Sequence, residues 1–574
     1  MASLACWTCR LRRKRCDRTQ PVCKSCASLS ISCCYSQERP EWMDGGEKQL
    51  AKTQAIKAQV KQGATARRGG SEAAIRVFSL HTSQQAERSP TVAPELSPAS
   101  SPGPPQRSGS SSATTTDESA VEETENFLTT LYLDTVFPLL FPQYEPTTLS
   151  GGRSWISALL KTNKAVFHSA LGTSAYYFAL MLAKDATHTL RTPCEQHLWD
   201  TLAKHMEMSI KTIKHDMDQY HLQGSCSDVF SKLHVLEGVV QYLIFATAMP
   251  QGANWKIHLS AALTLLNEIL QSHGTNDGAY SLEKVIQMMD KPSIFDGMYL
   301  GFRVWNNDQA AFQFYTSFLL HADVVSSIQL GQPSQLRPHY QSLIAGREAF
   351  MAPDGSTQPL PGLEAFVGCH GWVLTTLSEI SEMEAKKRSS KRKEEWFSDE
   401  LIRKSHYLKT KLQISMEGID ANIGPECHTT QLDSMRSCKQ DRTTQLQKDI
   451  IITEIWLHAA IIYLSVVSDG WQPSSLHIRE HVNSILGILD IFSSELSIRS
   501  LMLPLCISGF LAMPEQESQF RRIFSALGLL QTPGPAKWAL RLIEQVWELR
   551  HELDGDRWGL YDCFQIMGSE VLLI

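Results

Sequence analysis

The residues best suited to chemistry in this 574-residue chain are six cysteines near its N-terminus. They form two copies of a C-x2-C-x6-C unit offset by 17 positions: Cys6, Cys9, Cys16, Cys23, Cys26 and Cys33. Thiolates at such spacings suit tetrahedral zinc, and the absence of histidine from residues 1–36 disfavours mixed Cys/His modules. Six sulfurs fill the eight positions of two four-coordinate ions only if two of them bridge. The spacing therefore predicts two structural Zn²⁺ ions with no position left for substrate.

A disulfide knot is the alternative reading of these cysteines, and it needs an oxidising compartment. The N-terminus is too charged for the apolar core of a signal peptide, and the cysteines after Cys34 are scattered singly. We therefore expect a soluble intracellular protein with reduced thiols. Cys34 directly follows Cys33. The repeated six-residue spacing favours Cys33 as the ligand and leaves Cys34 as the alternative.

Charge is distributed unevenly between the N-terminus and the rest of the chain. Residues 1–36 carry seven Lys/Arg against one acid, whereas the whole chain has a net charge of −6. Between Cys9 and Cys16 the sequence reads RLRRKR, and between Cys26 and Cys33 it reads ASLSIS. Only the first half can neutralise phosphates, so we expect it to face DNA. The candidate DNA-binding residues are Arg10, Arg12, Arg13, Lys14, Arg15 and Lys24. A nuclear-import signal is the alternative role for this basic run.

The pattern C-x2-C-x6-C-x6-C-x2-C-x6-C resembles the fungal Zn₂Cys₆ binuclear cluster. The resemblance implies that Cys6 and Cys23 bridge the two ions. It assigns the remaining ligands so that Cys9 and Cys16 complete one zinc site and Cys26 and Cys33 complete the other. Pro21 corresponds to the proline that sets the turn between the halves in this family.

The same resemblance assigns roles to the basic residues. Arg12 and Arg13 align with the pair that lies next to the bases, and an arginine can contact both O6 and N7 of one guanine. Arg10, Lys14, Arg15 and Lys24 are then expected to hold phosphates, which positions the module without specifying sequence. The family implies double-stranded DNA with CGG-like triplets as the ligand and favours a homodimer.

Composition divides the chain into four segments: the cluster (1–36), a helical extension (37–62), a disordered Ser/Pro-rich linker (63–120) and a large body (121–574). Pro40–Gly46 resembles a segment of acriflavine-sensitivity-type regulators. Glu47–Lys61 lacks sustained heptads, so we predict an exposed helix with lysines over the DNA backbone and no zipper. Glu87–Ala120 has nine Ser and six Pro, a composition that cannot offset its ordering entropy. Its three Ser-Pro pairs suit proline-directed kinases, and plain linker chemistry is the alternative.

Helical periodicity dominates the body, and strand alternation is scarce. The expected helices are Thr124–Pro138, Trp155–Lys184, Cys194–Tyr220, Val229–Ala248, Trp255–Gln271, Trp305–Ile328, Leu363–Lys387, Leu446–Val467, Leu476–Phe492 and Ala536–Leu553. The stretches LYLDTVFPLLFPQY, NWKIHLSAALTLL, GCHGWVLTTLSEISEMEA and RSLMLPLCISGFLAMPEQ resemble the fungal-specific transcription factor domain. Ile450–Val467, the most apolar stretch, is too short and too polar for a membrane span. The fold prediction is a zinc-stabilised module joined by a disordered linker to an all-α body.

The sequence contains no GxxxxGK[ST], HExxH or GxSxG motif, so we expect no enzyme. Trp305, Phe312, Phe314, Tyr315 and Phe318 are expected to lie in the core, and KKRSSKRK at 386–393 is a second import candidate in a loop.

We predict a nuclear, sequence-specific transcription factor acting on RNA polymerase II genes of a metabolic, secondary-metabolite or drug-response pathway. The transcriptional machinery and a small-molecule effector are further candidate partners, and no membrane is expected. The alternatives are a metabolite sensor or enzyme with an accessory cluster, and a zinc-dependent interaction scaffold.

Overall fold

The computed structural model describes residues 5–11 and single residues or short runs between 16 and 56. Beyond these it describes 113–146, 151–182, 192–223, 228–249, 254–276, 279–291, 304–340, 364–389, 399–421, 439–492, 496–526, 534–552, 558–568 and 571–574, with isolated residues between some of these ranges. The chain divides into two compact units, Met1–Ser97 and Pro98–Ile574. Most of the predicted linker, residues 63–112, lies outside the described part of the chain. Residues 113–120, which the sequence assigns to the end of this linker, belong to a helix that begins at Ala113.

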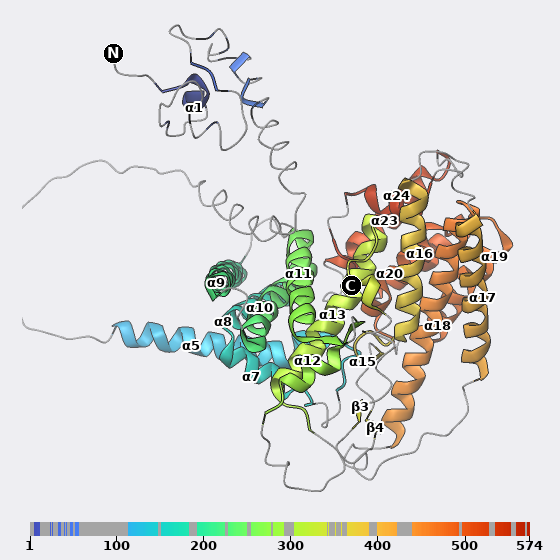
Figure 1. The fold of residues 1–574 in the computed structure, drawn as a ribbon, viewed down its shortest axis with the longest axis horizontal. Coiled ribbons are helices and arrows are strands. Elements are labelled where there is room, and N and C mark those ends of the chain that lie inside the picture. The colour runs from blue at the N-terminus through green and yellow to red at the C-terminus, as the bar shows by residue number, and fades with distance from the viewer. Residues whose placement is uncertain are drawn as a thin grey trace, which may run out of the picture. The chain divides into compact units, whose positions relative to one another are not determined.

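The body is helical, as the periodicity predicts (Figure 1). Its first group of helices comprises α5 (Ala113–Leu131), a π-helical turn η1 (Tyr132–Val136), α6 (Phe137–Leu140), α7 (Ser154–Thr162), α8 (Lys164–Leu182), α9 (Pro193–Gln223), α10 (Val229–Ala248), α11 (Trp255–His273), α12 (Leu282–Met288) and α13 (Asn307–Leu330). A short 3₁₀ turn, η3 (Arg337–His339), follows.

The second group comprises α15 (Glu364–Val367), α16 (Gly371–Ser389), α17 (Asp399–Ala421), α18 (Lys439–Asp469), α19 (Leu476–Phe492), η7 (Ile498–Leu501), α20 (Met502–Phe510), η8 (Pro514–Gln516), α21 (Glu517–Ser525), α23 (Pro535–Leu549) and α24 (Leu560–Gln565). The strands in the described residues form two antiparallel pairs of two-residue segments, β1 (Thr275–Asn276) with β2 (Ala279–Tyr280) and β3 (Phe350–Met351) with β4 (Thr357–Gln358).

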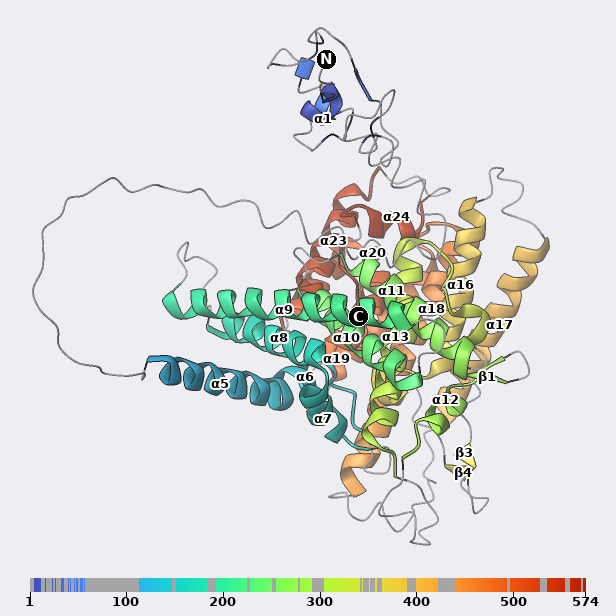
Figure 2. The ribbon, with the colours of Figure 1, turned by 60° about the vertical axis from the view of Figure 1, so that its left-hand side comes forward.

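Helix α13 is the centre of the body, and it contacts α7, α10 and α11 of the first group and α16 and α24 of the second (Figures 1 and 2). Every residue from Gln309 to Gln329 is buried, which explains why the segment has no separate polar face. Asn306 starts the helix with a capping box that includes Gln309, and Gly331 ends it in the left-handed conformation at φ 56°. The predicted core aromatics of this segment are buried from Phe312 to Phe318.

Two predicted helices are broken by residues with specific structural tasks. Trp155–Lys184 divides at Asn163, whose side-chain oxygen accepts hydrogen bonds from the backbone N–H groups of Ala165 and Val166 and so caps α8. Leu363–Lys387 divides at Gly368, which has φ 75°, and a Cβ at this position would lie 2.7 Å from Ile452.

The predicted basic loop at 386–393 is wrong for its first residues, because Lys386–Ser389 form the last turn of α16. Lys387 donates a hydrogen bond to the backbone oxygen of Val467, and the guanidinium of Arg388 lies 3.3 Å from the centre of the Tyr561 ring. These side chains stabilise packing within the body. Residues 390–393 lie outside the described part of the chain.

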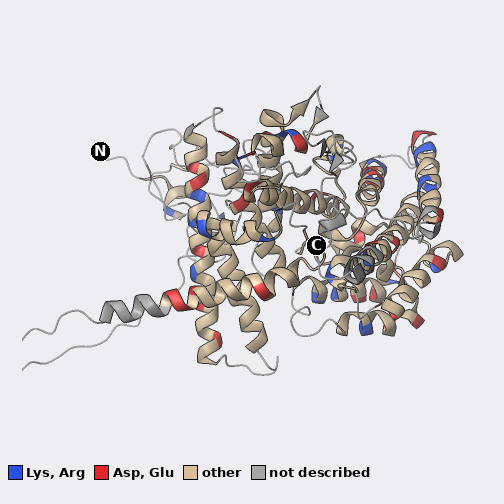
Figure 3. Ribbon diagram, turned by 90° about the horizontal axis from the view of Figure 1, so that it is seen from below, with Lys and Arg blue, Asp and Glu red and all other residues tan. Residues whose placement is uncertain are grey.

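Three segments are long and apolar enough to cross a membrane by length and hydropathy: Lys164–Leu182, Val229–Ala248 and Lys448–Asp469. The last extends the apolar stretch that the sequence suggested was too short for this purpose. Between 67% and 83% of each segment is buried against the rest of the body, so packing within the protein accounts for its composition. Acidic and basic residues are interspersed over the other helices of the body (Figure 3).

Candidate metal centre and nucleic-acid interface

The first helix described in the N-terminal unit is the short α1 (Trp7–Leu11), which lies at the first two cysteines of the repeat. Cys6 precedes the helix and Cys9 lies within it, so their three-residue separation places both sulfurs on one side of a single turn. The end of the repeat returns to this helix. The Trp7 N–H donates to the backbone oxygen of Cys34 at 2.8 Å, and the Cys34 N–H donates to the hydroxyl of Thr8 at 3.2 Å.

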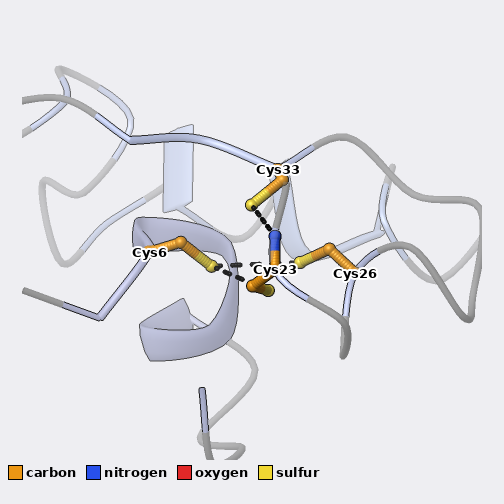
Figure 4. Close-up of side chains that lie close together, drawn as sticks. All are labelled: Cys6, Cys23, Cys26 and Cys33. Atoms are coloured by element: carbon orange, nitrogen blue, oxygen red, sulfur yellow. Dashed lines mark hydrogen bonds between the residues drawn. The ribbon is translucent and has the colours of Figure 1, made fainter. Parts of the chain in front are cut away.

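The six predicted ligand sulfurs lie in two overlapping groups of four. One group is Cys6, Cys9, Cys16 and Cys23, and the other is Cys6, Cys23, Cys26 and Cys33. Within each group all sulfur atoms lie within 4.8 Å of one another. Figure 4 shows the second group, in which the side chain of Cys6, the residue just before α1, points toward Cys23 and Cys26. Two residues, Cys6 and Cys23, belong to both groups.

The separations between the sulfurs suit tetrahedral zinc. Two sulfurs on one such ion, each at about 2.3 Å from it, lie about 3.8 Å apart. The observed distances from Cys23 are 3.7 Å to Cys6 and 3.6 Å to Cys9, and Cys6 lies 3.9 Å from Cys26. A disulfide requires about 2.05 Å, and the described cysteines are all free thiols. The residues present therefore fit a zinc cluster, in which each ion is held entirely by thiolates.

Four of these sulfurs, those of Cys6, Cys9, Cys23 and Cys26, have no exposure to solvent. Burial raises the pKa of the Cys6, Cys9 and Cys26 thiols, because a thiolate is poorly solvated there. Several buried thiolates at these distances would repel one another without a cation between them. Bound zinc removes that penalty, which makes its binding part of the folding of this unit.

Cys34 occupies a different position from Cys33. The sulfur of Cys33 belongs to the second group and accepts a hydrogen bond from the Cys23 N–H at 3.5 Å. Cys34 is outside both groups, and its backbone holds α1 through the two bonds described above. The geometry favours Cys33 over Cys34 as the zinc ligand, and Cys33 is the residue that preserves the spacing of the repeat.

Of the predicted DNA-binding residues, the described part of the chain contains Arg10. This arginine lies on α1 with its side chain exposed, and its guanidinium is 4.8 Å from the centre of the Trp7 ring. The cation–π contact holds the charge beside the helix that carries the predicted zinc ligand Cys9. The other predicted residues, Arg12, Arg13, Lys14, Arg15 and Lys24, lie outside the described residues, as does Pro21.

One residue of this unit that sequence reasoning missed is Ile56. It is 3% exposed and packs in the same apolar cluster as Cys6, Cys9, Cys23 and Cys26. The prediction of an exposed extension is therefore wrong at this position. Nearby, the ammonium of Lys52 lies 5.8 Å from the centre of the Trp42 ring, and Gln54 is exposed. A signal was available in the sequence, because Ile56 is one of the few large apolar residues between Glu47 and Lys61.

Comparison with known proteins agrees with both units. Residues 4–41 match the family model of the fungal Zn(2)-Cys(6) binuclear cluster domain. Residues 126–574 match the model of the fungal specific transcription factor domain, which covers most of the chain. No solved structure matches the chain.

Several relatives match the chain over most of its length. The chain is 31% identical over 630 residues to "Transcription factor dibT" of Pestalotiopsis microspora, covering 99% of this chain and 98% of the relative. It is 23% identical to "Pestheic acid cluster transcriptional regulator 3" of Pestalotiopsis fici, covering 96% of each. It is 22% identical to "Trichothecene biosynthesis transcription regulator TRI10" of Trichoderma arundinaceum, covering 76% of this chain and 95% of the relative. The chain therefore belongs to the fungal transcription factors that join a Zn(2)-Cys(6) cluster to a fungal specific transcription factor domain.

Proposed function

We propose that the protein binds two structural zinc ions through its six repeated cysteines and reads CGG-like triplets in double-stranded DNA with the basic half of the cluster. The observation that carries this proposal is the pair of sulfur groups sharing Cys6 and Cys23. Two groups of four with two common members hold two tetrahedral ions with six sulfurs. When bound, the zinc supplies structural stability, and the chain's own residues make the contacts to DNA.

The basic stretch after Cys9 supplies those contacts in the proposal. Arg12 and Arg13 contact base edges in the major groove, where a guanidinium donates to two acceptors of one guanine. Arg10, Lys14, Arg15 and Lys24 contact phosphates. The exposed side chain of Arg10 beside Trp7 supports a phosphate contact, because it places a fixed charge on the outer side of α1.

The biological role proposed is control of RNA polymerase II transcription of a secondary-metabolite pathway from the nucleus. Support comes from the relatives, two of which are named for pestheic acid and trichothecene biosynthesis. We further propose that the protein acts as a homodimer, which binds two triplets at a fixed spacing. We also propose that the helical body contacts the transcriptional machinery and controls its activity.

Selection from random duplex DNA with the full chain tests the recognition step. Zinc-loaded protein is expected to enrich CGG-containing sites, and protein treated with a chelator is not. Arg13→Ala is expected to lose about 1–3 kcal/mol of discrimination at the guanines. Arg10→Ala is expected to weaken binding to all sequences alike and to reduce the salt dependence by about one phosphate contact. A zinc-loaded protein that enriches no motif contradicts the proposal.

Metal content tests the ligand assignment separately. Two zinc ions per chain are expected for the wild-type protein. Cys33→Ser is expected to lower that content, and Cys34→Ser, its matched control, is expected to leave it unchanged. Equal losses from both variants overturn the assignment of Cys33. If Arg12→Ala and Arg13→Ala together leave target-gene control intact, the cluster serves as an interaction scaffold instead.

A further inference from the structure

The body contains a small cavity at the place where its two groups of helices meet. The cavity measures about 40 Å³, several times the 10–15 Å³ that one water molecule requires. Its walls come from segments far apart in the sequence: residues 140–142, α10, α13, α15, η7 and the last residue, Ile574. Such a junction is a common position for ligand sites in helical proteins.

The interior of the cavity is mainly apolar. Phe141, Phe318 and Phe366 form part of the wall, with ring centres 5.5–6.3 Å apart in tilted and edge-to-face contacts. Ile244 and Val367 add buried aliphatic surface. A molecule that enters the cavity exchanges water for hydrocarbon contacts on several sides, which favours an apolar ligand.

One polar side chain in this wall has an unused hydrogen-bonding atom. His321 is 6% exposed, and its Nε2 has no hydrogen-bond partner among the described residues. Burial lowers the pKa of His321 to about 4, so the ring is neutral at physiological pH. An unsatisfied buried nitrogen costs free energy, and water or a ligand atom that bonds to it removes that cost.

The entrance is marked by the lining residues that are not fully buried: Pro142, Arg499 and Ser500. Arg499 lies near the hydroxyl of Tyr177, and among the described residues no ion pair joins its guanidinium to a carboxylate. The cavity therefore combines a cation at its entrance, hydrocarbon walls, and a neutral nitrogen inside. That order matches an elongated molecule with an acidic end.

We propose that this cavity binds a small apolar carboxylic acid, or the acid end of a larger one, with the carboxylate at Arg499 and the apolar part among the phenylalanines. The site belongs to the body and is independent of DNA reading by the cluster. An engineered cavity of about 150 Å³ admits benzene. The smaller volume here favours a short aliphatic acid and requires the walls to move for an aromatic one.

Calorimetric titration of the full chain with butyrate, hexanoate and benzoate tests the proposal, with 1-butanol and 1-hexanol as uncharged controls at equal ionic strength. We expect saturable binding of at least one acid. The matched alcohol is expected to bind at least about tenfold more weakly, because it cannot form the charge-assisted hydrogen bond. No saturable binding of any acid overturns the proposal and leaves a cavity filled by water. Equal affinity for the acid and its alcohol overturns the role of Arg499.

Variants at the cavity provide the second arm. Arg499→Gln is expected to weaken acid binding about tenfold or more, whereas Arg541→Gln, an exposed arginine on α23, is expected to change nothing. Ser500→Leu narrows the entrance without changing charge and is expected to abolish binding. Wild-type affinity in both Arg499→Gln and Ser500→Leu overturns the site. None of these outcomes alters the result of DNA selection, so the two proposals fail separately.

Discussion

Replacement of Ile56 by alanine tests whether the extension after the cluster is part of the zinc-binding unit. Ile56 lies 22 residues after Cys34 in the chain, yet it is 3% exposed and packs with four cysteines. A unit this small buries little other apolar surface, so one isoleucine is a large share of its core. Alanine is also a better helix former than isoleucine, so a loss of stability cannot come from helix propensity.

The size of the effect follows from burial. Removing a buried isoleucine side chain costs about 2–5 kcal/mol, and we take about 2 kcal/mol because the partly buried Leu11 and Tyr35 beside it can relax into the space. Zinc binding and folding are coupled in such modules. A loss of about 2 kcal/mol therefore weakens the apparent zinc affinity about 30-fold. Ile56→Val, which removes one methyl group, is expected to cost about 1 kcal/mol, or about fivefold.

Competition with a chromophoric chelator measures this affinity in the full-length protein at constant pH. Gln54→Ala is the matched control, because Gln54 is exposed two positions earlier in the same segment. We expect the control to hold zinc as the wild-type protein does. If Ile56→Ala retains zinc within about twofold of wild type, the burial of Ile56 does not stabilise the cluster, and the inference is refuted.

Three further predictions concern the stability of the body, each measured by chemical denaturation. Asp323→Ala should lower the free energy of unfolding by about 3 kcal/mol or more. The buried carboxylate accepts hydrogen bonds from two backbone N–H groups at 2.9 Å and from the Tyr340 hydroxyl at 2.7 Å. A loss below about 1 kcal/mol contradicts this prediction. Burial raises the pKa of Glu237 to about 7, so the folded state holds a proton that the unfolded state releases near pH 4.5. Stability should therefore fall by about 3 kcal/mol as pH rises from 4.5 through 7, and Glu237→Gln should remove that dependence; an unchanged pH profile in the variant contradicts the assignment. Gly509→Ala should destabilise the protein by about 1 kcal/mol, because the added Cβ would lie 2.9–3.3 Å from atoms of Ile543. Gly487→Ala should stabilise it by about 0.5–1 kcal/mol, because nothing lies within 4 Å of the added Cβ. Stabilisation by both variants contradicts the packing of Gly509 against Ile543.

Local patterns made part of the fold predictable. Val229–Ala248 and Leu476–Phe492 match α10 and α19 at both ends, because chemistry near each end is visible in the sequence. Asp228 caps the first helix by accepting a hydrogen bond from the Ser231 N–H, and Pro250 follows soon after it ends. The cysteine repeat is predictable for the same reason, since coordination geometry dictates its spacing.

Other elements escaped prediction, either because a local signal was misleading or because their cause lies far away in the chain. Helix α20 contains Pro504, which suggests a break, but a proline in the first turn removes no intrahelical hydrogen bond. Glu384 is a buried acid on α16 that accepts a bond from the Tyr463 hydroxyl on α18, 79 residues later. Neither partner shows a local signal of that pairing. The burial of Ile56 likewise depends on its packing in the cysteine cluster, which no spacing rule contains.

The end of α13 explains how the two groups of helices are coupled. The side-chain amide of Gln329 donates to the backbone oxygen of Val571 at 3.0 Å, and its oxygen accepts from the Leu573 N–H at 3.1 Å. These bonds fix the segment that ends at Ile574, a wall residue of the cavity, to the same helix that carries His321. A ligand shifts a conformational equilibrium only through its different affinity for the two states. A molecule held between α13 and this segment contacts walls from both groups at once, so its binding favours the arrangement in which they are packed together.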